Sequence, residues 1–157
     1  MNGLTLRGVR VEYGGCAVVS SVDEKLAAGE WLCLIGPNGA GKSSLLRALA
    51  GLVDFSGSVQ LGNSEIRGLS ARELARQVAF VPQEPVLPDD MSVTDYVMLG
   101  RNPYISTFGR ESAHDRDVVA GLITELSLAV YARRMLGTLS GGERQRVVIA
   151  RALAQEA

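Results

Sequence analysis

Hydrophobic and polar positions alternate along the start of the chain with the period of two that is typical of a half-buried β-strand. Residues 4–13 follow this period, with a change of phase near Gly8, and the glycines at 14–15 predict a turn. A second strand is predicted at about residues 17–22. The apolar run at residues 31–35, WLCLI, predicts a strand that is buried on both faces of a sheet.

Helical patterns begin after the glycine-rich residues 36–41. Residues 42–50, KSSLLRALA, favour a helix that Gly51 can end in the left-handed conformation. The stretch GSVQLGNSEI predicts a short hairpin that turns at residues 62–63, and VAFVPQ at residues 78–83 predicts another buried strand. Strands that alternate with helices in this way favour an α/β fold.

Three serines are each followed by an acidic residue three positions later, the spacing of a helix N-cap. They predict helices that begin at Ser70 with Glu73 and run to about Gln77, at Ser92 with Asp95 and run through Leu99, and at Ser112 with Asp115 and run to about Leu126. No repeat or low-complexity linker separates this helical part from the rest. We therefore expect one domain over residues 1–157, with a helical subdomain at about residues 88–140 inside it.

Composition narrows the functional classes. The 157 residues suit one domain, and 16 basic against 17 acidic residues exclude a global electrostatic attraction to nucleic acid. The two cysteines, Cys16 and Cys33, lack a metal or disulfide spacing, so we expect buried or incidental thiols. Neither a signal peptide nor a membrane-spanning run is recognisable, which predicts a soluble cytoplasmic chain. Lys25 and Lys42 are the only lysines.

The sequence GPNGAGKSS matches the pattern G-x-x-x-x-G-K-[ST] of a phosphate-binding loop. Its glycines allow successive backbone N–H groups to turn toward a phosphate, and the helix that follows adds its positive end. A lysine neutralises the β- and γ-phosphates, and a serine hydroxyl binds Mg²⁺. The predicted phosphate-binding residues, called the phosphate loop below, are Gly36, Pro37, Asn38, Gly39, Ala40, Gly41, Lys42, Ser43 and Ser44.

A second helix start has the features of an anion site. Ser140 is a good N-cap, and Gly141 and Gly142 leave backbone N–H groups open at the beginning of the helical segment ERQRVVIARALAQE. No lysine accompanies them. The alternative is an ordinary capped helix whose first turn, Glu-Arg-Gln-Arg, is solvated.

Together, LSGGERQR and the upstream GPNGAGKSS resemble the signature and Walker A motifs of the ATP-binding cassette (ABC) transporter ATPases. The resemblance covers the whole chain. It implies an α/β P-loop NTPase core with an N-terminal β-subdomain and the inserted helical subdomain. It further implies that the signature contacts the γ-phosphate held by the phosphate loop of a second subunit, in a head-to-tail dimer with two ATP. The signature residues are Leu139, Ser140, Gly141, Gly142, Glu143 and Gln145.

Two further residues match positions of the family. Tyr13 stands where the family places an aromatic ring stacked on adenine, while the alternative is a strand residue packed in the core. Gln83 matches the Q-loop glutamine, which binds Mg²⁺ or water together with Ser43 and links the site to the transport partner. The resemblance thus implies ATP and Mg²⁺ as cofactors.

The segment LGRNPYISTFGRE at residues 99–111 and the acid-rich helix after it resemble the helical subdomain of importers for iron chelates, haem and cobalamin. This implies permease subunits as direct partners, a substrate-binding protein as an indirect one, and a place on the cytoplasmic face of the membrane. We interpret His114 as a surface residue and the arginines and acids of residues 109–117 as a solvated helix face.

The family also needs a Walker B strand that ends in Asp-Glu, a D-loop and a switch histidine, and none of these motifs is found here. We therefore expect a fragment truncated before the Walker B strand, with no catalytic base and no turnover of its own. Two alternatives stay open. One is a fragment of a non-transport ABC ATPase of DNA repair or translation. The other is a short protein that binds nucleotide or a partner without catalysis.

Overall fold

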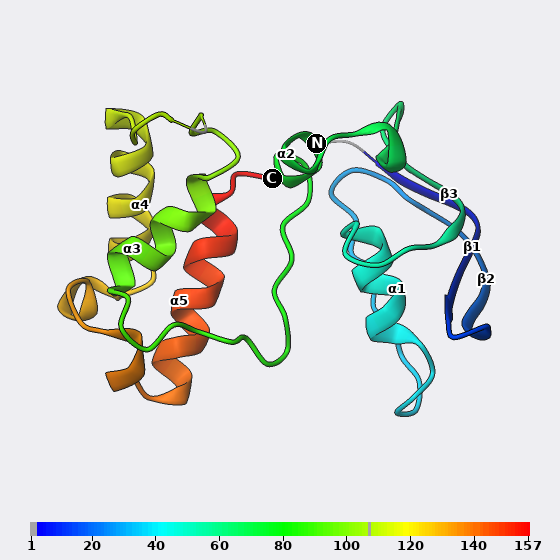
Figure 1. Cartoon of the computed structure of the whole chain (residues 1–157), viewed down its shortest axis with the longest axis horizontal. Helices are drawn as coiled ribbons and strands as arrows, with labels where there is room; N and C mark the ends of the chain where they lie inside the picture. Colours follow the sequence, from blue (N-terminus) through cyan, green and yellow to red (C-terminus); the bar gives the residue numbers. More distant parts are fainter. Residues whose placement is uncertain (1–2, 107) are drawn as a thin grey trace. The chain divides into compact units, whose positions relative to one another are not determined.

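The computed structural model describes residues 3–106 and 108–157. The chain forms two compact units, which meet in sequence between Leu74 and Ala75. The first unit holds a sheet and the helix α1, and the second is helical (Figure 1). Within the described residues, no helix combines the length and the apolar character that crossing a membrane requires.

The first unit is built on an antiparallel sheet with the strand order β2-β1-β3-β4. Its elements are β1 (Leu4–Tyr13), β2 (Cys16–Leu26), α1 (Lys42–Leu49), β3 (Ser56–Leu61), β4 (Ser64–Glu65) and the 3-10 turn η1 (Ile66–Gly68), followed by α2 (Ala71–Ala75). The predicted turns at residues 14–15 and 62–63 are confirmed, because Tyr13 pairs with Cys16 and Leu61 with Ser64 across them. The second strand is longer than its hydrophobic pattern indicated.

The phase change in β1 is confirmed as an irregularity of the ladder at Gly8. Gly8 has a φ of 57°, and the pairing of β1 with β2 changes register between Leu6 and Val9. On the other side of β1, a side chain at Gly57 would stand 2.3 Å from the Gly8 carbonyl oxygen, at a φ of 88°. Only glycine fits at residue 57, because the backbones of β1 and β3 approach each other too closely here for a side chain. The irregularity lets Leu6 and Val9 both reach the core.

The core of the first unit lies between one face of the sheet and α1. Its buried members are Leu6, Val9, Val11, Val19, Leu45, Ala48, Val59 and Ile66. Leu45 and Ala48 lie three residues apart on α1 and face the sheet together, as the helical period requires. This packing fixes the axis of α1 and therefore the position of its N-terminus.

The predicted strand at residues 31–35 is wrong, because these residues form no ladder with any described strand. One face of the segment borders a mainly apolar cavity of about 230 Å³, which Leu32 and Leu34 line together with Leu45 and residues of β1 and β2, and Leu32 remains 45% exposed. The opposite face is open, with Trp31 97% and Ile35 90% exposed. The side chains alternate between two faces as in a strand, but a ladder also needs a neighbouring strand to pair with the backbone N–H and C=O groups. Both cysteines are exposed free thiols.

The strand predicted for residues 78–83 is also wrong. This segment has no regular structure, and Val81 is 41% exposed. It too lacks a neighbouring strand among the described residues, and Pro82 removes a backbone donor from any ladder. The helix α2 before it begins after Ser70 as predicted, with Ser70 and Glu73 bonded to each other, but it ends at Ala75 rather than near Gln77.

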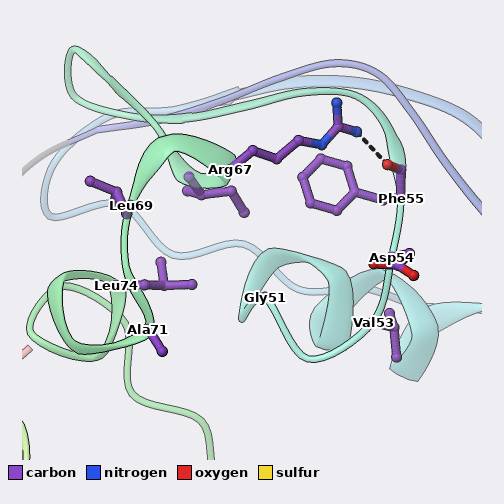
Figure 2. A pocket seen from close by; sticks show the side chains of 9 residues that line it. Gly51, Val53, Asp54, Phe55, Arg67, Leu69, Ala71 and Leu74 are labelled. Carbon is purple, nitrogen blue, oxygen red and sulfur yellow. Dashed lines mark hydrogen bonds between the residues drawn. The ribbon is translucent and has the colours of Figure 1, made fainter.

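A cavity of about 310 Å³ lies beside the C-terminal end of α1 (Figure 2). Its lining residues are Gly51, Val53, Asp54, Phe55, Ile66, Arg67, Leu69, Ala71 and Leu74. The guanidinium carbon of Arg67 lies 4.3 Å from the centre of the Phe55 ring, and the same side chain donates to the Phe55 carbonyl oxygen. Arg67 therefore joins η1 to the segment that leads into β3.

The second unit consists of helices. They are α3 (Val93–Met98), η2 (Leu99–Arg101), α4 (Ala113–Glu125), η3 (Ala129–Tyr131), η4 (Leu136–Thr138) and α5 (Gly141–Ala154). The predicted caps are confirmed, since the side chains of Ser92 and Ser112 accept from the backbone N–H groups of Asp95 and Asp115. The core lies between α3, α4 and α5. Its buried members are Val93, Tyr96, Val97, Val119, Ile123, Leu128, Leu136, Leu139, Val147, Val148, Ala150 and Ala154.

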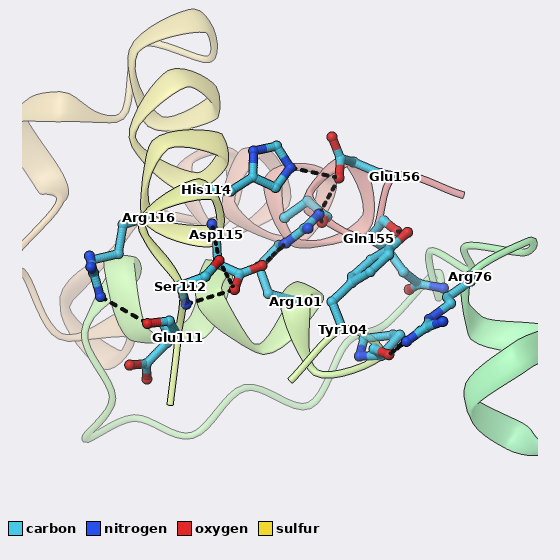
Figure 3. A network of polar contacts seen from close by, with 12 residues as sticks. Arg76, Arg101, Tyr104, Glu111, Ser112, His114, Asp115, Arg116, Gln155 and Glu156 are labelled. Carbon is cyan, nitrogen blue, oxygen red and sulfur yellow. Dashed lines mark hydrogen bonds and ion pairs between the residues drawn. The ribbon is translucent and has the colours of Figure 1, made fainter. Parts of the chain in front are cut away.

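The interpretation of residues 109–117 as a solvated helix face is wrong for Asp115, which is 5% exposed (Figure 3). Asp115 accepts from Nε of Arg101 at 2.9 Å, and Arg101 is itself 1% exposed. Arg101 also donates from Nη1 to the Ala154 carbonyl oxygen at 2.8 Å, which ties the end of α5 to the start of α4. Burial of an ion requires such partners, so the two charges stay together in the core. His114 is exposed, as predicted.

Candidate functional site

The phosphate loop is an exposed turn that leads directly into α1. Gly39 and Gly41 have φ angles of 82° and 83°, a conformation that side chains rarely allow, and the Ala40 N–H donates to the Pro37 carbonyl oxygen at 3.3 Å. Residues 36–40 are exposed, and Gly41 is partly buried. The predicted glycine-rich turn before a helix is therefore present.

Gly41 holds the end of this turn against the sheet. A Cβ atom at this position would lie 2.3 Å from the Val18 carbonyl oxygen of β2. The loop backbone therefore lies too close to β2 for any side chain at residue 41. Gly41 is also the N-cap of α1, whose first turn, KSSL, contains no acidic residue. The open N–H groups of this turn and the helix dipole favour an anion here.

The Lys42 side chain closes the turn. Its Nζ atom donates to the carbonyl oxygens of Gly36 at 2.8 Å and of Pro37 at 2.7 Å. An ammonium group has three donors, so one donor and the net charge remain for a ligand at the mouth of the loop. Lys42, Ser43 and Ser44 all stand in the first turn of α1, at the residues whose N–H groups are open. The arrangement suits a polyphosphate chemically.

Tyr13 ends β1 beside the glycine turn and is 46% exposed. Tyr13 is therefore not packed in the core, which was the alternative interpretation. In Figure 1 the turn between β1 and β2 and the loop before α1 lie at the same end of the first unit. An exposed aromatic face is what stacking on a base requires. The role itself stays a prediction.

Gln83 is exposed in an irregular segment of the second unit, and not at the end of a strand as predicted. Ser43 belongs to the first unit. The metal site that these two residues share in the prediction therefore stays a prediction.

The signature segment forms the N-terminus of α5. Ser140 and Glu143 make a reciprocal capping box: the Ser140 N–H donates to Glu143 at 2.7 Å, and the Glu143 N–H donates to the Ser140 hydroxyl at 3.4 Å. The pKa of the Glu143 carboxyl is lowered from its ordinary value, mainly by the hydrogen bond from the Ser140 backbone N–H. Among the described residues outside the helix's own backbone and the neighbouring positions, no atom lies within 4 Å of a Cβ placed at Gly141 or Gly142. Leu139 is buried and Gln145 is exposed.

Sequence reasoning missed two side chains that bind the backbone just before the signature helix. Arg144 and Arg134 bind the carbonyl oxygens of the turn that precedes α5. The alternative of a solvated first turn does not describe Arg144, because its Nε and Nη2 atoms both donate to carbonyl oxygens. No sequence signal marks these contacts, because an arginine in the first turn of a helix can equally well point to solvent.

Comparisons with known proteins agree with the motifs. A sequence model of the ABC transporter family matches residues 19–157. The iron(3+)-hydroxamate import ATP-binding protein FhuC of Bacillus subtilis is 37% identical over 99% of this chain and 58% of its own length. The hemin import ATP-binding protein HmuV of Bordetella parapertussis is 42% identical over 97% of this chain and 57% of its own length. The cobalamin import ATP-binding protein BtuD of Halobacterium salinarum is 38% identical over 98% of this chain and 38% of its own length.

Solved structures share the fold. An ATP binding subunit of an ABC transporter matches with a TM-score of 0.82 at 25% identity, covering 97% of this chain and 62% of that one. A bacterial Atm1-family ABC exporter with ATP bound matches with a TM-score of 0.80 at 26% identity, covering 98% of this chain and 28% of that one. The chain spans between 38% and 58% of the length of the three relatives named above. With a family match that covers most of its residues, the chain belongs to the ABC transporter ATPase family.

Proposed function

We propose that this chain contributes the ATP-binding site of an importer ATPase that takes up an iron chelate, haem or cobalamin. The observation that carries the proposal is the turn at residues 36–41, closed by Lys42 and followed by an acid-free helix start. The import of iron(3+)-hydroxamate, hemin and cobalamin by the relatives FhuC, HmuV and BtuD supports the substrate class. The alternatives of a non-transport ATPase and of a short binding protein have no comparable support.

The residues present fit MgATP. Lys42 and the N–H groups at the start of α1 bind the β- and γ-phosphates, because a cation and a helix N-terminus both favour that charge. The Ser43 hydroxyl and Gln83 hold Mg²⁺, and the exposed ring of Tyr13 stacks on adenine. Bound ATP supplies the phosphoanhydride bond whose hydrolysis drives transport. The water-polarising acid is not among the residues identified here, so hydrolysis is proposed for the complete protein.

The signature end of α5 acts in trans. Its open N–H groups at Gly141 and Gly142 contact the γ-phosphate bound by the phosphate loop of a second subunit, in a head-to-tail dimer. The absence of a lysine from the signature fits this arrangement, since the partner's loop supplies one. A helical subdomain at about residues 88–140 contacts permease subunits at the cytoplasmic face of the membrane. A substrate-binding protein takes part through the permease.

Competition between nucleotides tests the proposal on the complete protein. Unlabelled ATP and ADP should each displace a fluorescent ATP analogue, and AMP should compete at least about tenfold more weakly, because charge-assisted bonds to the outer phosphates are lost. A Tyr13→Ala control should weaken ATP and AMP by the same factor, since both carry the base that the ring stacks on. Equal competition by ATP and AMP would show that the loop does not bind phosphates.

A further inference from the structure

Arginines bind three successive carbonyl oxygens, those of residues 137–139, in the turn that leads into α5. Arg144 donates from Nε to the Leu139 oxygen at 3.2 Å and from Nη2 to the Gly137 oxygen at 3.0 Å. Between these two, the Thr138 oxygen accepts from Nη2 of Arg134 at 3.1 Å. Three successive carbonyl groups therefore point to guanidinium groups, and not to the open side of the helix start.

The same turn is attached to the segment before α3. The Gly137 N–H donates to the Asp89 carbonyl oxygen at 3.1 Å, and the Leu136 N–H donates to the Met91 oxygen at 2.9 Å. The Asp89 carboxylate lies 3.8 Å from Nη2 of Arg144, and a Cβ atom at Gly137 would lie 2.9 Å from the Asp89 Cβ. Arg144 thus lies where α5, its preceding turn and residues 89–91 meet.

These contacts fix the backbone where it enters α5. The peptide groups that carry the oxygens of residues 137–139 also carry the N–H groups of residues 138–140, and the Ser140 N–H already donates to Glu143. The arginine contacts therefore hold the chain up to Ser140, the N-cap from which α5 starts. The open N–H groups of Gly141 and Gly142 point out of this helix start, so their place depends on where the N-cap is held.

We propose that Arg144 is a positioning residue for the signature. It holds the Gly137 and Leu139 carbonyl groups, and with them the N-cap of α5, so that the open N–H groups of Gly141 and Gly142 face the γ-phosphate of the partner subunit, and it does not touch the nucleotide. This inference rests on the proposed function in trans. The two-point contact needs the planar fork of arginine, because a lysine ammonium is a single point and spans the two oxygens less well.

The test compares variants of the complete protein by ATPase kinetics and by MgATP affinity. Arg144→Met should lower kcat roughly tenfold to hundredfold, because small misplacements of a catalytic group have effects of that size. The Kd for MgATP should stay within about twofold, since the phosphate loop itself is unchanged. Arg144→Lys should keep the charge and still leave kcat low. Arg116→Met is the matched control: Arg116 binds the Glu111 carbonyl oxygen at 3.0 Å in the same unit, at the start of α4.

The outcomes separate the two claims. If wild-type turnover does not depend on Lys42, the proposed function itself fails. If it does depend on Lys42 and Arg144→Met retains the wild-type kcat, only the positioning role is overturned. A full recovery in Arg144→Lys would also overturn it, because charge alone would then suffice. Where Arg144→Met melts early, Arg144→Lys and Arg144→Gln at a temperature below melting give the same comparison of kcat with Kd.

Discussion

Replacing Lys42 with alanine should weaken ATP binding by about tenfold to a hundredfold. Each charge-assisted hydrogen bond to a phosphate is worth about 1.5–3 kcal/mol, and the substitution removes the cation that faces the outer phosphates. It also opens the turn, because the contacts of Nζ with the Gly36 and Pro37 oxygens close it in the absence of ligand. Equilibrium titration of the complete protein with a fluorescent ATP analogue measures the change.

Lys25 provides a matched control, because it is the other lysine of the chain and is exposed on β2. Lys25→Ala removes the same charge and should leave the Kd for ATP unchanged. Lys42→Arg tests geometry, since its rigid fork should recover only part of the affinity. An unchanged Kd in Lys42→Ala would remove the phosphate loop from the binding site. An equal loss in Lys25→Ala would mean that net charge, and not this site, governs binding.

Asp115→Asn should lower the free energy of unfolding of the complete protein by about 3 kcal/mol, near the lower end of the range for breaking a buried ion pair. The substitution keeps an oxygen for the cap with Ser112 but leaves Arg101, which is 1% exposed, with less negative charge around it. Glu156 remains as a partner of Arg101, which limits the loss. Denaturant titration measures it. Asp117→Asn, on the exposed side of the same helix, should change stability by less than about 0.5 kcal/mol.

The pH dependence of the free energy of unfolding should differ between wild type and Asp115→Asn. Hydrogen bonds from Ser112, together with the bond from Arg101, lower the pKa of Asp115 from 3.8 to about 2. An acid with a lowered pKa in the folded state stabilises the fold above its ordinary pKa, and this contribution is lost as the pH falls through the folded value. The stability difference between wild type and Asp115→Asn should therefore be constant above about pH 5 and shrink between pH 4 and pH 2. A difference that stays constant down to pH 2 would mean that Asp115 has an ordinary pKa.

Local signals account for most of what could be predicted from the sequence. The capping serines, the glycines of the two hairpin turns and the glycine pattern before Lys42 act within a few residues, so their effect can be inferred without knowing the rest of the fold. The phosphate loop is recognisable for this reason. The change of phase at Gly8 is also local, because it appears in the alternation itself.

Long-range contacts account for the errors. The runs at residues 31–35 and 78–83 have the composition of buried strands, but a ladder depends on a neighbouring strand that composition does not report. Asp115 has the sequence context of a surface helix start, and its burial depends on Arg101 fourteen positions away. The role proposed for Arg144 depends on its bonds to carbonyl groups, which a residue pattern does not reveal. Strand pairing, the burial of Asp115 and the contacts of Arg144 thus depend on packing and backbone direction, which local propensity does not determine.

The exposure of Trp31 has a practical consequence, because it is the single tryptophan of the chain. An indole that is 97% exposed emits at the long-wavelength limit and is readily quenched by iodide. Anything that covers the open face of residues 31–35 will shift this emission toward the blue and protect it from quenching. The segment lies directly before the phosphate loop, so intrinsic fluorescence can report on its surroundings without any added label.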